Sequence, residues 1–445
     1  MTGAAPSPGI PGTARPASVL RDRNFLRLWT GETISILGTT ISDFAIAIVA
    51  VLTLDATSAE IGLMRALGEA PAIVIGLFVG VWVDHVRRRR LLVTLDLLAA
   101  LAVASIPIAH LLDVLSLGQL FVLAGVFGVL GTFWGPAWGA FLPTVVERDR
   151  IVDANSKLTL AMSATGIVGP GLAGFLVQVL TAPIAMVLDA VSFLISAVCV
   201  SGVRTRETGT TADDDEDMAR VGHRIREGLR VAFLDPMQRA ITTPLVMLEF
   251  VNALSFAVYA IFVLEVVGLE PVALGVVFAI ASAGFLSGSA AAPWLERRMG
   301  AGRAAILGLG LVAASPFTMV LADADHPLAL NLFFLGLPGI LGGFGGIVQW
   351  VMLSSLRQAI TPERVIGRVY ASVGVLWGVM TILGALTGGL LGEDERLGPR
   401  GTILVAAIGY TIPFFWTLFG PIRHATTADG TREPTPLEAA PGDPG

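Results

Sequence analysis

The chain has 445 residues and a formal net charge of −6, and it is 54% hydrophobic and only 14% charged. Soluble globular domains carry about 25% charged residues, so this composition excludes an ordinary soluble enzyme or nucleic-acid-binding domain. Apolar runs of roughly 20 residues recur from end to end, and each is long enough to span a bilayer. We therefore predict an all-α membrane protein in contact with lipid.

The apolar runs form two groups of six. We expect the first six membrane-spanning helices at residues 25–54, 60–83, 91–113, 118–144, 156–180 and 182–203. The second six are expected at residues 239–266, 270–294, 303–322, 328–353, 367–391 and 401–421. The sequence thus predicts twelve transmembrane helices, in an N-terminal bundle over residues 19–203 and a C-terminal bundle over residues 239–423.

Three polar segments flank and join the predicted bundles. Residues 1–18 and 424–445 are rich in proline and glycine, and we predict disordered tails there. Residues 204–238 form a linker in which Met218, Val221 and Ile225 recur at helical spacing. This spacing predicts an amphipathic helix on the membrane surface, with a solvated linker as the alternative.

The arginines alternate between loops. They occupy the N-terminal tail and the loops after spans two, four, six, eight and ten, whereas the loops after spans one, three, five, seven and nine hold none. Arg396 and Arg400, after span eleven, are the exceptions. Because basic residues concentrate in cytoplasmic loops, this pattern predicts that both termini are cytoplasmic.

A glycine face ends the second predicted span. Gly76, Gly80 and Asp84 follow at intervals of four, so they share one face of a helix that a neighbouring backbone can approach closely. Four arginines, residues 87–90, come next and mark a loop. We interpret this pattern as a contact between helices that slide.

This spacing resembles the loop signature of the major facilitator superfamily, Gly-x-x-x-Asp-Arg-x-Gly-Arg-Arg/Lys. Gly80, Asp84, Arg88 and Arg89 match it, and His85 departs from it. The resemblance implies two pseudo-symmetric six-helix bundles and a gating role for this loop. It also implies that Asp84 contacts the start of span eleven when the cytoplasmic side is closed.

The two predicted bundles repeat each other. Ala72, Gly76, Gly80 and Asp84 have counterparts at the same spacing in Gly284, Gly288, Ala292 and Glu296. In transporters built from such halves, the substrate site lies between them near the middle of the membrane.

Charged residues inside spans are costly and are therefore candidate functional residues. Arg65 and Glu69 lie one turn apart and can pair on their own helix. We expect Asp43 at a similar depth, so that Arg65 serves two carboxylates; the alternative is a static ion pair. Asp189 is interpreted as a helix-packing residue. The candidates for proton coupling are Asp43, Arg65, Glu69 and Glu249.

Gly169, Pro170 and Gly174 lie in span five. They resemble the exporter signature of the superfamily, Gly-x-x-x-Gly-Pro-x-x-Gly-Gly, which implies an antiporter or exporter rather than an importer. Proline permits a kink, and the glycines permit tight packing against a neighbouring helix.

Aromatic and amide side chains in other spans are candidates for a cavity that takes a bulky amphipathic solute. The alternative for each aromatic residue is contact with lipid. The candidates are Phe133, Trp134, Trp138, Asn252, Gln349, Trp350 and Trp377.

Short stretches at Phe25–Trp29, Ala154–Asn155 and Arg357–Gln358 resemble the bacterial branch of macrolide, multidrug and enterobactin exporters. We therefore expect a monomeric, proton-coupled exporter of a drug-like, macrolide-like or siderophore-like molecule in a bacterial plasma membrane. The alternatives are a nutrient importer or facilitator, a lipid flippase and a membrane sensor. No nucleotide-binding loop, metal-ligand spacing or nucleophile constellation appears, so we expect no enzyme activity, cofactor, metal or nucleic-acid partner.

Overall fold

The computed structural model describes residues 18–147, 150–204, 226 and 229–424. The side chains of residues 77, 78, 81, 84, 363, 364 and 424 and the surroundings of Gly80 are outside this description. Both predicted tails lie outside it apart from Ser18 and His424, and so does most of the predicted amphipathic helix.

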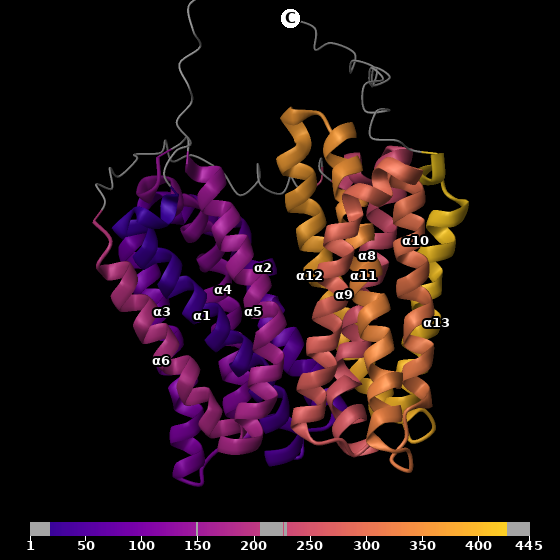
Figure 1. Cartoon of the computed structure of the whole chain (residues 1–445), viewed down its shortest axis with the longest axis horizontal. Coiled ribbons are helices and arrows are strands. Elements are labelled where there is room, and N and C mark those ends of the chain that lie inside the picture. Colours follow the sequence, from indigo (N-terminus) through magenta and orange to yellow (C-terminus); the bar gives the residue numbers. More distant parts are fainter. Residues whose placement is uncertain (1–17, 148–149, 205–225, 227–228, 425–445) are drawn as a thin grey trace, which may run out of the picture.

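Six long helices build the N-terminal half (Figure 1). They are α1 (Arg23–Ile48, extended by the π-helix η2, Val49–Thr53), α2 (Ser58–His85), α3 (Arg88–Leu111), α4 (Leu117–Val145), α5 (Ile151–Leu180) and α6 (Ala182–Ser201).

The C-terminal half repeats this arrangement. Its helices are α8 (Pro236–Ile261, extended by the π-helix η4, Phe262–Val266), α9 (Pro271–Met299), α10 (Ala301–Ala314, extended by η5, Ser315–Leu321), α11 (Leu328–Ile360), α12 (Glu363–Glu393) and α13 (Gly398–Phe419). The first helix of each half thus ends in a π-helix of five residues.

Each predicted span overlaps one of these helices. Eleven of them are long and apolar enough to cross a membrane, and the remaining one, α2, is 28 residues long. The described residues contain no strand. The predicted all-α membrane fold of two six-helix bundles is therefore confirmed.

Side-chain caps fix where several helices begin. The Asp22 carboxylate accepts hydrogen bonds from two backbone N–H groups in the first turn of α1, and the Asp235 carboxylate accepts one from the Gln238 N–H in the first turn of α8. Thr57 and Glu60 form a capping box at the start of α2. These side chains satisfy backbone donors that have no partner within the helix, so each helix starts at a defined residue.

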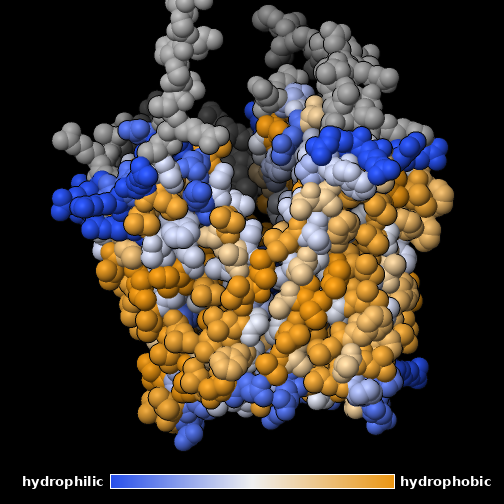
Figure 2. All heavy atoms as spheres, viewed as in Figure 1, coloured by the Kyte–Doolittle hydropathy of each residue, from blue (hydrophilic) through white to orange (hydrophobic). Residues whose placement is uncertain are grey.

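The ends of the described chain, Ser18 and His424, lie on the same face of the molecule, here called the terminal face (Figure 1). The opposite face is called the closed face, because the halves meet there. Figure 2 shows an apolar band around the molecule, with polar residues gathered at both faces. This distribution is the one expected of a protein embedded in lipid.

The halves meet chiefly through α2 with α12 and α5 with α9, and α2 also contacts α8. Hydrogen bonds across the boundary include Gln178 to Glu270 at 2.9 Å and the Ala59 backbone N–H to Glu393 at 3.3 Å. Toward the terminal face the two bundles separate, and the surface is notched between them (Figures 1 and 2). The structure is therefore open on the terminal face.

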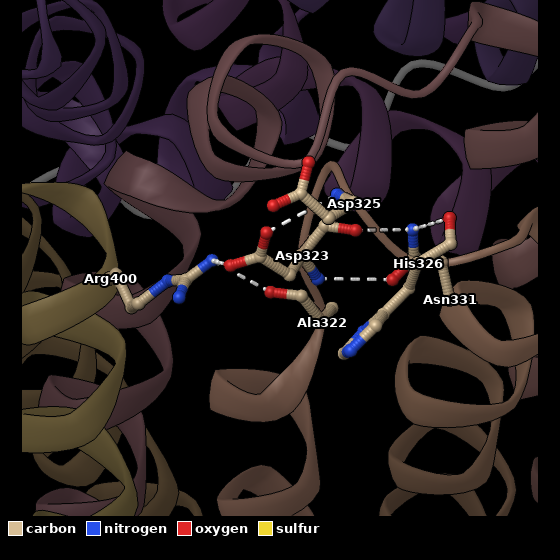
Figure 3. Close-up of polar contacts among 6 residues, drawn as sticks. All are labelled: Ala322, Asp323, Asp325, His326, Asn331 and Arg400. Atoms are coloured by element: carbon tan, nitrogen blue, oxygen red, sulfur yellow. Dashed lines mark hydrogen bonds and ion pairs between the residues drawn. The ribbon is translucent and has the colours of Figure 1, made fainter.

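Arg400, one of the two exceptions in the arginine pattern, lies on the closed face at the start of α13. Its guanidinium donates to the Asp323 carboxylate at 2.7 Å and to the Ala322 carbonyl at 2.8 Å (Figure 3). The Asn331 side chain holds the same loop by exchanging hydrogen bonds with the Asp323 backbone. A neighbouring carboxylate thus balances this arginine.

Candidate functional site

A cluster of charges lies where α2 faces both halves. The Arg65 guanidinium is 3.5 Å from the Glu69 carboxylate on the same helix. It also lies over the ring of Phe256 on α8, 5.6 Å from the ring centre. Arg65 therefore starts in the N-terminal half and reaches the C-terminal half.

Two further carboxylates lie within the electrostatic reach of Arg65. Its charge attracts Asp43 on α1 and also Glu249 on α8. Thr381 of α12 donates a hydrogen bond to Glu249 at 2.9 Å. The three carboxylates among the four sequence candidates for proton coupling are thus gathered around the fourth, Arg65, and Glu249 belongs to the other half.

Asp43 lies in a concave position. Protein atoms surround its carboxyl group, yet the residue keeps solvent-accessible surface. A side chain that lines an open hollow has both properties, whereas a core residue would have no accessible surface. Asp43 is therefore placed where ions or water can reach it.

A cavity of about 480 Å³ opens beside Arg65, within the C-terminal half. Arg65 of α2 lines it, its other walls come from α8, α9, α10, η5, α11 and α13, and its polar lining includes Glu249, Asn252 and Gln349. The Tyr410 hydroxyl donates to the Asn252 side chain at 2.6 Å. The buried carbonyl oxygen of the Gln349 side chain has no hydrogen-bond partner, so one strong acceptor is available there.

Aromatic and apolar groups form the remaining walls of this cavity. Phe256, Tyr259, Phe278 and Met319 all line it. Tyr259 and Phe278 meet edge to face, with their ring centres 5.7 Å apart. A small number of polar groups in a mostly apolar hollow is the usual composition of a site for an amphipathic small molecule.

The aromatic sequence candidates lie elsewhere. Trp350 and Trp377 stack on each other at 5.3 Å, between α11 and α12. Phe133 contacts Trp82 of α2, and Trp134 contacts Phe193 of α6 inside the N-terminal half. None of these, nor Trp138, lines the 480 Å³ cavity. Of the sequence candidates for a cavity, Asn252 and Gln349 are the two that line it.

The span-five residues lie on the boundary between the halves. A methyl group added at Gly174 would be 3.1 Å from the Gly275 Cα on α9, and one added at Gly275 would be 2.7 Å from the Pro170 carbonyl. Gly169 faces Thr40 on α1. The tight packing expected of this motif is therefore present, and it joins α5 to the other half.

The residues of the loop motif lie at the terminal end of α2 and at the start of α3. A methyl group added at Gly76 would lie 3.6 Å from the methyl group of Thr132 on α4, an ordinary contact distance. Arg89 donates to the Val203 carbonyl at 3.0 Å, which ties the loop to the end of α6. The surroundings of Gly80 and the side chain of Asp84 lie outside the description, so the gating role of these residues stays a prediction.

Sequence reasoning missed several residues at this site. Thr381 and Tyr410 bind Glu249 and Asn252, and Phe256 lies under Arg65. Hydrogen-bonding side chains are uncommon in apolar spans, so Thr381 and Tyr410 carried a signal. The contact between Arg65 and Phe256 had no signal in the sequence, because it depends on how the two halves pack.

Two six-helix bundles that meet on one face, separate on the other and hold charges between them define a multi-pass membrane transporter. The chain belongs to the Major Facilitator Superfamily, whose family model matches residues 28–385. The superfamily resemblance of the loop motif is thereby confirmed.

Its relatives include known efflux proteins. The chain is 28% identical over 358 residues to the multidrug efflux pump Tap of Mycolicibacterium fortuitum, covering 78% of this chain and 84% of Tap. It is 23% identical over 390 residues to macrolide efflux protein A of Streptococcus pyogenes, covering 86% of this chain and 93% of that protein. A bacterial homologue of the iron transporter ferroportin, in an inward-facing state, shares the fold with a TM-score of 0.70 at 18% identity. The match covers 90% of this chain and 99% of the homologue.

Proposed function

We propose that this protein is a secondary active exporter that exchanges protons for a drug-like, macrolide-like or siderophore-like molecule by alternating access. The observation that carries this proposal is the position of Arg65, which lies among carboxylates of α1, α2 and α8. Because α8 belongs to the other half, the ionic interactions of Arg65 cross the boundary that must rearrange during transport. The names of the efflux relatives support the same direction of transport.

Protonation changes this cluster in a defined way. A proton on Glu249 removes a negative partner of Arg65 from the C-terminal half, which weakens the attraction between α2 and α8. A proton on Asp43 does the same within the N-terminal half. The proton occupancy of these carboxyl groups therefore biases how the two halves pack, which is the coupling that antiport needs.

The terminal face is proposed to be cytoplasmic, because the arginine-rich loops gather there. The present structure is then open to the cytoplasm, as substrate uptake by an exporter requires. In the other state, Asp84 would close this face by contacting the positive N-terminal end of α12. The Asp84→Asn variant is expected to fold and to lose transport, and full efflux by this variant would remove the latch from the mechanism.

The cavity beside Arg65 is proposed as the substrate site. Its aromatic walls fit an apolar body, and Glu249, Asn252 and the unpaired Gln349 oxygen fit a polar or cationic group. Because its polar lining is sparse, an amphipathic solute fits it better than a sugar or an amino acid. We propose that a monomer in the plasma membrane performs this exchange.

Reconstitution in liposomes with a trapped pH dye tests the proposal. A proton gradient is imposed, and macrolides, cationic dyes and siderophores are added in turn. We expect substrate-dependent proton flux that is lost in Asp43→Asn and in Glu249→Gln. Asp113→Asn, which removes an exposed carboxylate from the loop after α3, is the matched control and is expected to retain the flux. Substrate movement without proton flux would overturn the antiport mechanism.

A further inference from the structure

A second group of polar residues, made of three acids and four serines, lies away from the candidate site, where α6 packs against α1 and α3. We call it the seam. All its members except Glu32 are buried, although the helices around them are otherwise apolar. The seam consists of Glu32, Ser35 and Ser42 of α1, Asp96 of α3, and Asp189, Ser192 and Ser196 of α6.

Asp189 is the most enclosed member of the seam, with an exposed fraction of 0%. One carboxyl oxygen, Oδ1, accepts a hydrogen bond from the Ser192 hydroxyl at 3.0 Å. The other oxygen, Oδ2, is buried and has no hydrogen-bond partner. A buried oxygen of this kind is stable when it carries a proton and unfavourable when it carries charge.

Ser42 supplies the second observation. Its side chain is 3% exposed, and its hydroxyl oxygen is also buried without a hydrogen-bond partner. The hydroxyl lies beside the Asp189 carboxyl group. A serine hydroxyl can accept a hydrogen bond from a protonated Oδ2 or donate one to an ionised Oδ2, so Ser42 is placed to contact the Asp189 carboxyl group in either protonation state.

The charges that face Asp189 are all negative. Asp43, the residue after Ser42, repels it from α1. Asp96 of α3 lies beside Ser196 one turn beyond Ser192, and Glu32 of α1 faces Asp96. Arg65 of α2 attracts Asp43 but is not among the charges that act on Asp189, and Arg27 of α1 lies toward the terminal face, where it donates to the Gly202 carbonyl.

The other elements packed on α6 do not supply a compensating charge beside Asp189. Helix α4 presents aromatic rings, with Phe127 and Trp134 against Phe193. Helix α5 carries Asp153 and Lys157 in its first two turns, at the terminal face, where Asp153 accepts from the Val19 backbone. A proton is thus the positive charge that the described surroundings of Asp189 can accommodate.

We propose that Asp189 is a second proton-binding residue of this transporter, coupled to Asp43 through the electrostatic repulsion between the two carboxyl groups. Ser42 orients the Asp189 proton, and Asp43 on the next residue of α1 faces Arg65. When one carboxyl group loses its proton, its charge favours retention of the proton by the other, so the pair titrates as a unit. This inference rests on the proposed antiport for its role in transport, but proton binding by Asp189 does not.

Infrared spectroscopy of the reconstituted full-length protein tests proton binding without transport. A protonated carboxyl group has a C=O stretching band that shifts in D₂O, and an ionised group lacks that band. We expect the wild-type protein at neutral pH to show a component that disappears in Asp189→Asn and shifts in Ser42→Ala. The Asp113→Asn variant is the matched control and should leave the spectrum unchanged.

Three results would overturn the proposal. One is an identical protonated-carboxyl band in wild-type protein and in a folded Asp189→Asn variant. Another is a protonated-carboxyl band that does not shift in Ser42→Ala. This second variant tests proton binding by Asp189 even if Asp189→Asn does not fold. The third is loss of the Asp189 component when Na⁺ replaces a large organic cation at constant pH, because the site would then hold a metal cation.

The transport assay separates the two proposals. If wild-type protein moves substrate without protons, the antiport mechanism fails whatever the spectrum shows. If wild-type protein does exchange protons, Asp189→Asn is expected to keep substrate binding and lose the dependence of transport on pH. Unchanged pH dependence in this variant would reduce Asp189 to a packing residue.

Discussion

Gly174 of α5 and Gly275 of α9 touch through their backbones, because a methyl group at Gly174 would lie 3.1 Å from the Gly275 Cα. This contact joins the two halves on the closed face. It also explains why two small residues from opposite halves occur at the same depth. Side chains of any size at these positions would push the bundles apart.

Substitution of Gly275 by alanine is therefore expected to open the closed face. The new methyl group would meet the Pro170 carbonyl at 2.7 Å, and neither backbone can move without shifting a whole helix. Spin labels at Gln178 and Glu270, after removal of the single cysteine Cys199, would report a longer distance between α5 and α9. Gly171→Ala is the control, because its methyl group would meet Ala279 at an ordinary 3.9 Å. Equal distances in both variants would contradict this account.

The glycine faces of the two halves differ in how tightly they pack. A methyl group at Gly284 would lie 2.7 Å from the Ile340 Cα, whereas one at Gly76 would lie 3.6 Å from the Thr132 methyl group. Gly284→Ala should therefore lower the free energy of unfolding by about 1–3 kcal/mol, the usual range for overpacking. Gly76→Ala should be close to neutral. Denaturation in detergent measures both, and a larger loss for Gly76→Ala would refute the difference.

The hydrogen bond from Tyr410 to Asn252 fixes one wall of the proposed substrate cavity. Removal of the hydroxyl in Tyr410→Phe deletes a hydrogen bond to Asn252, which is itself exposed, so the expected loss of stability is that of one ordinary hydrogen bond, about 0.5–1.5 kcal/mol. We expect a lower thermal stability and weaker substrate binding. Tyr370→Phe is the control, because Tyr370 is exposed and its bond with Gln358 is long, at 3.4 Å. Unchanged binding by Tyr410→Phe would remove this wall from the site.

The loop on the closed face should respond to acid. The hydrogen bond from Arg400, followed by that from the Asp325 backbone, holds the pKa of Asp323 below its ordinary value (Figure 3). A carboxyl group whose pKa is lower in the folded state stabilises the fold above its unfolded pKa, about 3.9 for aspartate. That contribution is lost as the pH falls through the lower, folded value.

Thermal unfolding should therefore distinguish Asp323→Asn from wild-type protein at neutral pH, and the difference should shrink below about pH 4. High salt should also reduce it, since the pair is partly exposed. Asp325→Asn keeps the backbone donor and serves as the control. A difference that does not change with pH would mean that the ion pair contributes nothing.

Much of the fold follows from the sequence because lipid imposes simple rules. A run of roughly 20 apolar residues must become a helix in order to span the bilayer, and Arg65 and Glu69 can pair because they lie one turn apart. The partners of Arg65 on other helices depend on how the helices pack. The sequence predicts Asp43 as a partner of Arg65, because the two residues lie at a similar depth in neighbouring spans. The contact of Arg65 with Phe256 of α8 could be seen only in the structure.

The seam shows where the sequence held a signal that was not used. Gly31, Ser35, Gly38 and Ser42 recur on α1 at intervals of four and three, which is the spacing of a close helix contact. A methyl group at Gly38 would collide with Ser192 and Asp189. The sequence interpretation placed Asp189 in a contact between helices. Its proposed role in proton binding depends on Ser42 and Asp43 of α1, which that interpretation did not include.

The glycine contacts between the halves have a mechanical consequence. Where Gly174 faces Gly275, and where Gly389 faces the backbone of Ala59, the surfaces that meet are smooth main chain. Large side chains would interlock there, and many of them would have to change rotamer before the bundles could part. Smooth surfaces roll or slide without that step. The two arrangements of the halves can then stay close in free energy, so the binding of one small molecule or a proton is enough to choose between them.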